Sequence, residues 1–359
     1  MTTSAVPVDT VLADPLSLAR QADFAIGYVG LDIPEDILAA PGLFAAHLPW
    51  VAGRNTPEAD KWLEEAFPGW ARSMVEDWLA GKFDFLRYVV FSRGDDTSQR
   101  LYYYLCELRR RGVAAGPEPL IFDIAHIRKA SSLAWTIAAV RQLAQELGLD
   151  EAALQAGIHT ANSRRVRLQE LAAHRNAPGN TPGHAPGHAY ERIARAMLFA
   201  PLEKLDVVLP PTDPNLQGRL LLAGSSPPDD RLHKAAEAAH WSVVGEAYDR
   251  CLERLGPAIA ASSASAAERI GRHIHASEIG PRSFHDRAAR LLDLARHSRA
   301  SAAVFWLFEE DEAIAWDLAR SRQALESAGL PLLVLSRRRW DCSDAPEAEI
   351  TTFLRGLQP

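Results

Sequence analysis

Residues 220–249 read LLLAGSSPPDDRLHKAAEAAHWSVVGEAYD, and this stretch decides the fold class. It contains an apolar run at Arg219–Ser225, a helical pattern over about 229–240, and a second apolar run at Trp241–Tyr248. Strands that are continuously apolar and separated by a helix are typical of a parallel sheet whose two faces are both covered. The stretch therefore predicts an α/β fold.

The same alternation extends in both directions along the chain. Each expected strand is short, rich in β-branched or aromatic residues, and bounded by Gly, Pro or Asp. The first half has candidates at Phe24–Gly30, Leu43–Trp50, Arg87–Arg93 and Pro119–Ile124, and the second adds Ser301–Phe308 and Pro331–Ser336. The two halves follow one αβ plan, which predicts two Rossmann/flavodoxin-like open parallel-sheet domains with an added helical region.

Breaks in the pattern predict the domain limits. Residues 1–20 are small and polar and are expected to form an N-terminal arm. Residues 21–210 form the first α/β domain, with a helical extension over about 125–174 and a Pro/Gly loop at 176–189. The stretch LPPTDPNLQG at 209–218 is the expected linker, and residues 219–359 form the second domain.

Composition excludes several classes of protein. The 359 residues include 39 Lys and Arg against 46 Asp and Glu, a formal net charge of -7, which argues against a general nucleic-acid or anionic-membrane binder. We find no signal peptide and no apolar run long enough to span a membrane, and we expect a soluble cytoplasmic protein. Three widely spaced cysteines predict neither a disulfide framework nor a metal site made from this chain's thiolates alone.

Candidate functional residues follow the expected strands, because ligands of open parallel sheets bind beyond the carboxyl ends. Asp95, Asp96 and Glu309 lie in acidic turns that could supply an acid/base group or oxygen ligands, or could simply start a helix. Ser225 and Ser226 lie in a GSSPPDD turn that could offer hydroxyls and amides to an anion, or whose aspartates could cap a helix.

Histidine and arginine runs give weaker indications. His184 and His188 lie four apart in a loop, and His273 and His275 would share a face only if their segment were extended. A metal role is the less favoured interpretation for both pairs. The short basic runs at 109–111 and 337–339 suit solvated ends of elements or contacts to a phosphate-bearing ligand.

Taken in order, four stretches resemble the subunits of 2-hydroxyacyl-CoA dehydratases and benzoyl-CoA reductases. They are GYVGLDIPEDILAAPGLFAAHLPW at 27–50, PGWARSMVEDWLAGKFDFLRYVVFSRGDDTSQRLYYYL at 68–105, the stretch at 220–249 quoted above, and SFHDRAARLLDLARHSRASAAVFWLFEEDEAIAWDLARSRQALESAGLPLLVLS at 283–336. The resemblance covers most of residues 22–355 and is weakest at 150–218.

The resemblance implies two α/β domains, pairing with a homologous subunit, and a [4Fe–4S] cluster held between the domains by three cysteines. It also implies an ATP-dependent activator that delivers an electron for ketyl-radical chemistry on an acyl-CoA thioester. Arg72, together with Ser225 and Ser226, is then expected to contact the substrate.

The sequence departs from this family at all three cluster positions. Pro68 stands where the first cysteine is expected, Asp95-Asp96 where the second is, and Glu309 (or Phe308, with a slip of one residue) where the third is. Because iron–sulfur clusters need thiolate ligands, we predict no cofactor and no metal on this chain, with the [4Fe–4S] cluster on a partner subunit.

Three interpretations follow. In the first, the chain is the cofactor-poor subunit of an acyl-CoA dehydratase or reductase and pairs with a cluster-bearing homologue. In the second, the scaffold uses the inter-domain carboxylates Asp95 and Glu309 for non-radical or metal-assisted chemistry on a small acyl substrate. In the third, it is a non-catalytic structural or regulatory paralogue. We favour the first.

Overall fold

The structure, a computed structural model, describes residues 5–125, 127–177, 183–279 and 285–357. Its residue contacts define two compact units. Unit 1 comprises Met1–Arg167, Ala196–Asp206 and Leu255–Phe284, and unit 2 comprises Leu168–Arg195, Val207–Arg254 and His285–Pro359. The chain passes between the two units more than once, and the passage from Asp206 to Val207 is the one nearest to the linker predicted at 209–218.

Unit 1 is built on a four-stranded, wholly parallel sheet with the order β3-β2-β4-β5. Its strands are β2 (Ala25–Val29), β3 (Phe44–His47), β4 (Tyr88–Ser92) and β5 (Glu118–Phe122). The predicted strands of the first half are therefore confirmed. The chain reverses its direction of progress across the sheet between β2 and β4, and ligands of open α/β sheets bind at such a switch point.

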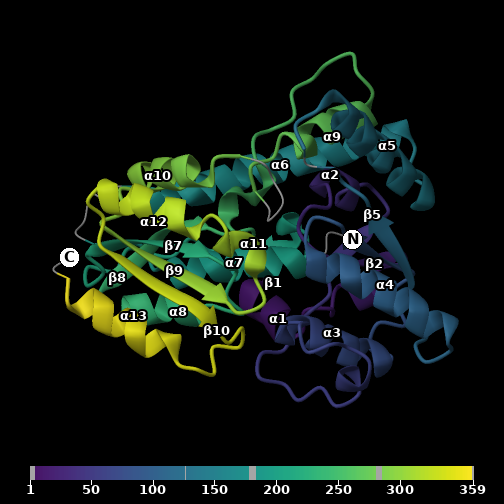
Figure 1. Ribbon diagram of the computed structural model, residues 1–359. Coiled ribbons are helices and arrows are strands. Elements are labelled where there is room, and N and C mark those ends of the chain that lie inside the picture. The colour runs from purple at the N-terminus through teal and green to yellow at the C-terminus, as the bar shows by residue number, and fades with distance from the viewer. Residues whose placement is uncertain (1–4, 126, 178–182, 280–284, 358–359) are drawn as a thin grey trace. The chain divides into compact units, whose positions relative to one another are not determined.

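Alternation along β2 explains why both faces of this sheet are covered. Ala25 and Val29 pack on one face against α3 (Gly69–Leu79) and α4 (Asp96–Arg110). Ile26 and Tyr28 pack on the other face against α5 (Ala130–Glu146) and α9 (Ala266–His275). Figure 1 shows the two helical layers on either side of the sheet. The strand has no polar face, as expected for a buried parallel strand.

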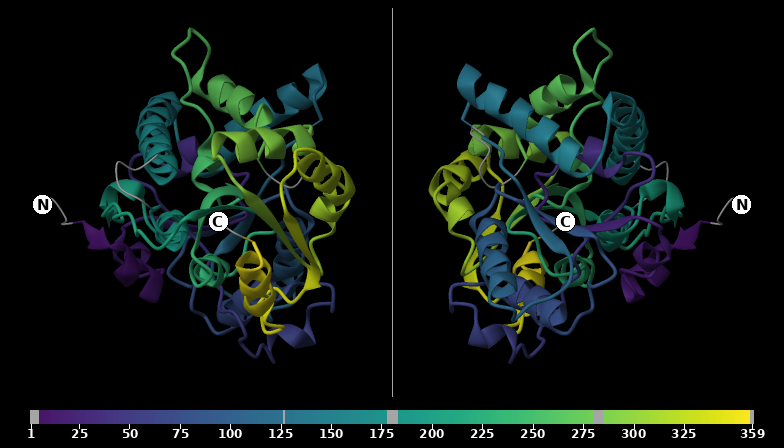
Figure 2. Two further views of the ribbon diagram at one scale, coloured as in Figure 1. Left: turned by 90° about the vertical axis from the view of Figure 1, so that its left-hand side faces the viewer. Right: turned by 90° about the vertical axis from the view of Figure 1, so that its right-hand side faces the viewer.

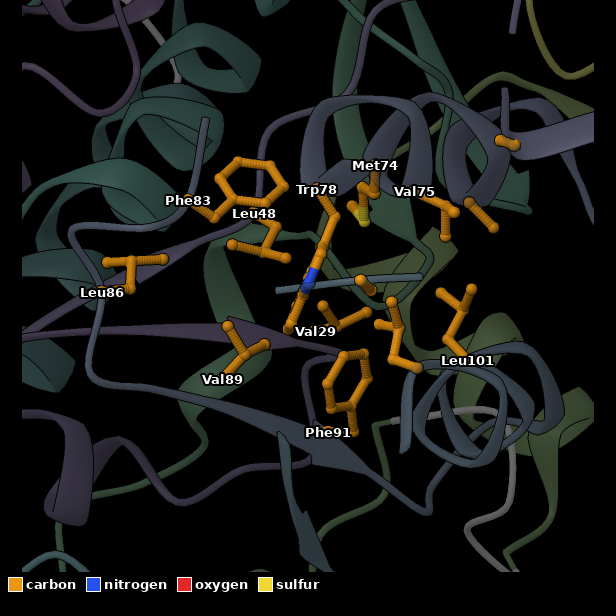
Figure 3. Packing of buried hydrophobic residues seen from close by; sticks show 14 of the residues in the cluster. Val29, Leu48, Met74, Val75, Trp78, Phe83, Leu86, Val89, Phe91 and Leu101 are labelled. Carbon is orange, nitrogen blue, oxygen red and sulfur yellow. The ribbon is translucent and has the colours of Figure 1, made fainter. Parts of the chain in front are cut away.

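Trp78 of α3 is the centre of the first of these layers. Figure 3 shows its indole between Val29 and Phe91 of the sheet and Phe83 beyond the end of the helix. The side chain is 2% exposed, and its ring nitrogen donates a hydrogen bond to the carbonyl of Ala115 at 2.8 Å. Its buried polar atom is therefore satisfied.

Unit 2 repeats the plan with the strand order β8-β7-β9-β10, again wholly parallel. Its strands are β7 (Gly218–Gly224), β8 (Trp241–Ala247), β9 (Ala302–Phe308) and β10 (Leu332–Arg338). Helices α10 (Arg287–His297) and α12 (Leu318–Ser327) cover one face, and α8 (Arg231–Glu237) and α13 (Pro346–Arg355) cover the other (Figures 1 and 2). Both halves thus share one topology, and the α/β prediction is confirmed.

The helices depart from expectation in several places. The helix predicted at 311–329 is divided into α11 (Glu312–Ala315) and α12, and neither α9 nor α13 was anticipated. The predicted Pro/Gly loop includes residues 178–182, which lie outside the described residues; around it, α6 (Glu151–Asn176) ends and α7 (Gly187–Phe199) begins. Within the described residues, none of the helices is both long and apolar enough to cross a membrane.

The segment expected as an N-terminal arm is packed in its described part. Strand β1 (Val6–Pro7) pairs with β6 (Leu205–Asp206), and α1 (Val8–Ala13) follows it. Val11, Leu16 and Ala19 are 0–3% exposed. Burial of these apolar side chains offsets the entropy cost of ordering the segment. The remaining short elements are η1 (Ala19–Gln21), α2 (Glu35–Leu38), η2 (Ala59–Lys61), η3 (Leu202–Lys204) and η4 (Leu252–Leu255).

Buried ion pairs attach α6 to the short helix α2 within unit 1. Both nitrogens of the Arg165 fork contact Asp36 at 2.8 Å, and the side chains are 2% and 1% exposed. Nη1 of the neighbouring Arg164 donates to Oε1 of Glu35 at 2.7 Å, and its other two nitrogens donate to Glu203. The helices approach so closely that a Cβ at Gly157 would lie 2.1 Å from the Asp36 carbonyl oxygen. Consecutive acids on one helix therefore face consecutive arginines on the other.

Breaking the Arg165–Asp36 pair should destabilise the protein strongly. Asp36→Asn or Arg165→Met leaves one charge buried without its partner, so each should lower the free energy of unfolding by about 3–5 kcal/mol. The double variant should recover part of that loss. Urea unfolding measures the effect, with Arg20→Met as the control, because the Arg20–Asp14 pair is about half exposed and should cost less than about 1 kcal/mol. Equal losses in the two pairs would contradict this assignment.

Candidate functional site

The turn after β4 carries Asp95, the first of the predicted catalytic residues. Asp95 is the N-cap of α4, and its Oδ1 accepts a hydrogen bond from the backbone N–H of Ser98 at 2.7 Å. This contact satisfies one of the free N–H groups at the helix start. Asp96 lies in the first helical turn and is exposed. The capping interpretation therefore describes what the Asp95 carboxylate does in this structure.

Two glycines allow the turns after β2 and β4 to meet at the switch point of unit 1. Gly30 has φ +90°, and a Cβ there would lie 2.6 Å from the Cβ of Ser92. A Cβ at Gly94 would lie 1.5 Å from Oδ2 of Asp32, a residue that is only 7% exposed. Any side chain at position 94 would displace the Asp32 carboxylate. Sequence analysis did not single out Asp32, although it follows a predicted strand.

Arg72, predicted to contact substrate, is engaged within unit 1. Its Nη1 donates to Oδ1 of Asp60, its Nη2 to the carbonyl of Glu64 and its Nε to the carbonyl of Phe67, at 2.6, 2.6 and 3.1 Å. All three guanidinium nitrogens thus hold the segment before α3 in place. A role in substrate binding stays a prediction.

The carboxyl edge of the sheet in unit 2 brings together two serines and two aspartates. The hydroxyl of Ser225, after β7, donates to Oδ2 of Asp311, after β9, at 2.7 Å. The neighbouring Ser226 hydroxyl donates to Oδ1 of Asp249, after β8. Three adjacent strands supply these residues, because parallel strands end at one edge of the sheet. The pairing of both predicted serines with carboxylates was not foreseen.

Asp311 has a proton affinity suited to acid–base chemistry. Burial raises the pKa of its carboxyl group to about 6; the hydrogen bond from Ser225 partly offsets this, and the nearby Asp249 carboxylate adds to it. A group with this pKa exists in both protonation states near neutral pH, so it can either donate or accept a proton. Of the residues in this cluster, Asp311 is the best candidate for proton transfer.

Glu309, the predicted residue of the same turn, is placed differently. Its side chain is exposed, and its backbone N–H donates to the carbonyl of Arg338 at 3.0 Å. Asp95 and Glu309 belong to different units. The sequence signal that identifies Asp249 and Asp311 is their position just after a strand. Glu309 was chosen over Asp311 because it matches an expected cysteine position of the resembling family.

A buried polar network supports the end of β8 directly before Asp249. Glu246 accepts hydrogen bonds from Arg175 at 2.8 Å and from Tyr248 at 2.7 Å, and its other contact is Nε2 of His233 at 2.9 Å. Burial opposes ionisation of Glu246, but Arg175 and His233 outweigh it and hold the pKa of the carboxyl group at about 2. Glu246 therefore stays ionised and fixes the strand from which Asp249 projects.

The histidines noted in the sequence are engaged in separate contacts. His184 contacts Arg219 at 3.1 Å, and His188, at the start of α7, contacts Glu237 at 2.7 Å. His273 and His275 lie on the helix α9, where residues two apart do not share a face, and each contacts a backbone carbonyl. Among the described residues, no group of three or more His, Cys, Asp or Glu side chains is arranged to hold a metal ion.

The three thiols do not fit an iron–sulfur cluster. Cys106 lies on α4 in unit 1, whereas Cys251 and Cys342 are buried in unit 2. Burial raises the pKa of all three thiols, that of Cys342 to about 12. At the expected ligand positions, Pro68 is the N-cap of α3 and Asp95 that of α4.

Removal of the Asp95 cap should destabilise α4. Asp95→Ala should lower the free energy of unfolding by about 1 kcal/mol, and Asp95→Asn by less, because an amide oxygen can still accept from Ser98. Asp96→Ala is the matched control from the same turn and should have the smaller effect. Hydrogen exchange along α4, measured by mass spectrometry, gives the answer. Unchanged exchange in Asp95→Ala would remove the capping role.

Asp311 should make stability fall as pH rises. Its folded pKa of about 6 lies above the unfolded value near 3.8, so the folded state binds the extra proton between these pH values and loses that advantage above them. Asp311→Asn should therefore be more stable than the parent at pH 8, by about 1–2 kcal/mol, and equal to it near pH 4. Urea unfolding at both pH values tests this, with Glu309→Gln as the exposed control. A gain that is the same at both pH values would refute the assignment.

Comparison with known proteins gives the family. The model of the 2-hydroxyglutaryl-CoA dehydratase D-component family matches residues 31–353, which is most of the chain and includes the edges of both sheets. A search of curated proteins finds no match. The match agrees with the resemblance seen in the order of the sequence motifs. The chain belongs to the 2-hydroxyglutaryl-CoA dehydratase D-component family.

Proposed function

We propose that this chain is a cluster-lacking component of a 2-hydroxyacyl-CoA dehydratase-type complex and that it pairs with a homologous subunit that carries the [4Fe–4S] cluster. The observation that carries the proposal is the donor chemistry. Pro68, Asp95 and Glu309 (or Phe308) stand at the three expected thiolate positions, and the chain's own cysteines lie at other positions, divided between the two units. A member of this family without thiolate ligands needs a second chain to supply them.

The contacts at the carboxyl edges of the two sheets support a functional component rather than a non-functional paralogue. The turns after β4 and β7 are held by specific hydrogen bonds from Ser98 and Ser225 to carboxylates. The buried charges at Glu246 and Arg175 are paired, although such pairs are costly to bury. In the proposed complex this chain contributes an interface and part of the pocket for an acyl-CoA, and an ATP-dependent activator serves the partner.

One observation favours a second candidate function, in which the chain carries out non-radical acid–base chemistry on a small acyl substrate. Asp311 has a pKa of about 6 beside Asp249, and a carboxyl group of this kind can transfer protons near neutral pH. For this candidate function we propose Asp249 and Asp311 as the carboxylate pair in place of Asp95 and Glu309. Hydrogen bonds from the neighbouring Ser225 and Ser226 connect Asp249 and Asp311 within one unit.

Anaerobic purification tests the first proposal. The chain produced alone should contain no iron or acid-labile sulfide and should not dehydrate a 2-hydroxyacyl-CoA. Co-produced with a cluster-bearing homologue, it should form a stable heteromer whose activity requires the activator and ATP. Replacing Cys106, Cys251 or Cys342 by Ala, one at a time, should leave the iron content of the heteromer unchanged. An iron- and sulfide-loaded chain purified alone, or a homomer with radical dehydratase activity, would overturn the proposal.

The same preparations separate the second candidate. An iron-free homomer that acts on an acyl thioester, and whose pH–rate profile loses its limb near pH 6 in Asp311→Asn, would favour acid–base chemistry. Activity found only in the heteromer, with an unchanged profile in Asp311→Asn, would exclude it.

A further inference from the structure

Residues 337–345 (RRRWDCSDA), which comprise the end of β10 and the turn after it, include three of the five non-glycine residues with positive φ in the described chain. Arg337, Cys342 and Ala345 have φ values of 55°, 57° and 56°, in the left-handed region. Only two other non-glycine residues in the described part of the chain, His240 and Arg299, have positive φ. Side chains with a Cβ rarely adopt this conformation, and such strain gathers at functional sites.

Arg337 also lies in an irregularity at the carboxyl edge of the sheet in unit 2. The register of β10 against β9 shifts between Leu335 and Arg338, so β10 carries one extra residue at this point. Bulges of this kind redirect side chains and occur beside binding sites. The bulge lies at the edge where an open parallel sheet receives its ligands, next in strand order to the turn after β9.

The charges of the segment are not balanced internally. Arg338 pairs with Asp344 at 2.6 Å and with Glu349 at 2.8 Å. The side chains of Arg337 and Arg339 are exposed, and neither makes an ion pair or hydrogen bond with any described residue. Two guanidinium groups are therefore free to contact a ligand at this strand end, in a chain whose net charge is -7.

The backbone that carries these arginines is fixed from the neighbouring turn. Arg231 donates to the carbonyl of Asp341 at 2.8 Å, and two of its nitrogens are held by Asp229 at 2.7 and 2.8 Å. The segment is also anchored by Trp340 and Cys342, which are 7% and 4% exposed. A fixed backbone reduces the entropy that binding would otherwise cost.

We propose that Arg337 and Arg339 bind the phosphate groups of a phosphorylated small ligand at this edge. Guanidinium groups match phosphate oxygens with paired, charge-assisted hydrogen bonds. The choice of ligand, the nucleotide end of a coenzyme A thioester, rests on the proposed function; the phosphate-binding role itself does not. The strain at position 337 is consistent with this role, because glycine would fit the backbone better but could not supply the cation.

Calorimetric titration of the full chain tests the proposal with coenzyme A, ADP and inorganic phosphate as separate probes. Arg337→Gln/Arg339→Gln should weaken binding of the phosphorylated probe about tenfold or more, and binding should weaken with added salt. Arg110→Gln/Arg111→Gln is the matched control, since it removes the same charge from exposed arginines that pair with Glu107. Stronger binding of coenzyme A than of the other two probes identifies the nucleotide end of coenzyme A as the ligand, and phosphate binding alone identifies a simpler anion site.

Arg337→Gly separates binding from folding. It should raise the thermal midpoint, because glycine accepts a positive φ, while it weakens binding of the phosphorylated probe. Unchanged binding in Arg337→Gly and in the double glutamine variant, or no binding of any probe by the parent chain, would overturn the proposal. The iron content and the partner dependence of activity test the proposed function independently, so either can fail without the other.

Discussion

A parallel sheet covered on both faces leaves almost no room for polar side chains along its strands, and the chemistry of this protein depends on that constraint. In β2, successive residues face α3 and α4 or α5 and α9, and all of them are buried. Polar groups therefore gather where the strands end. The residues of interest in both units, from Asp95 to Asp311, lie in these turns.

The same kind of residue does different work at the two edges. Asp95 accepts a hydrogen bond from the first turn of a 15-residue helix, so its carboxylate stabilises the N-terminus of that helix. Asp311 precedes the four-residue helix α11, is partly buried, and has Asp249 nearby, so ionisation is disfavoured. Local surroundings, rather than residue type, make the second carboxylate the better acid–base group.

The chain belongs to the dehydratase family, and that it lacks the family's cluster ligands is our proposal. Two buried ion pairs are prominent within the units. The Arg165–Asp36 pair joins two helices of unit 1, and the Arg175–Glu246 pair holds the end of β8, just before Asp249, in unit 2. Removing one partner of such a pair leaves an uncompensated buried charge, so both partners are needed for stability.

The sequence by itself determined the fold class, the eight main strands and the family, because apolar runs bounded by Gly, Pro and Asp are local signals that burial on both faces enforces. It also placed Ser225 and Ser226 at a strand end. Only the tertiary structure decided their hydrogen-bond partners. Asp311 and Asp249 follow different strands, and the order of strands in a sheet cannot be read from the sequence of a single segment. The packing of residues 5–20 and the positive φ of Arg337 were likewise decided by distant contacts and by the register of β10 against β9.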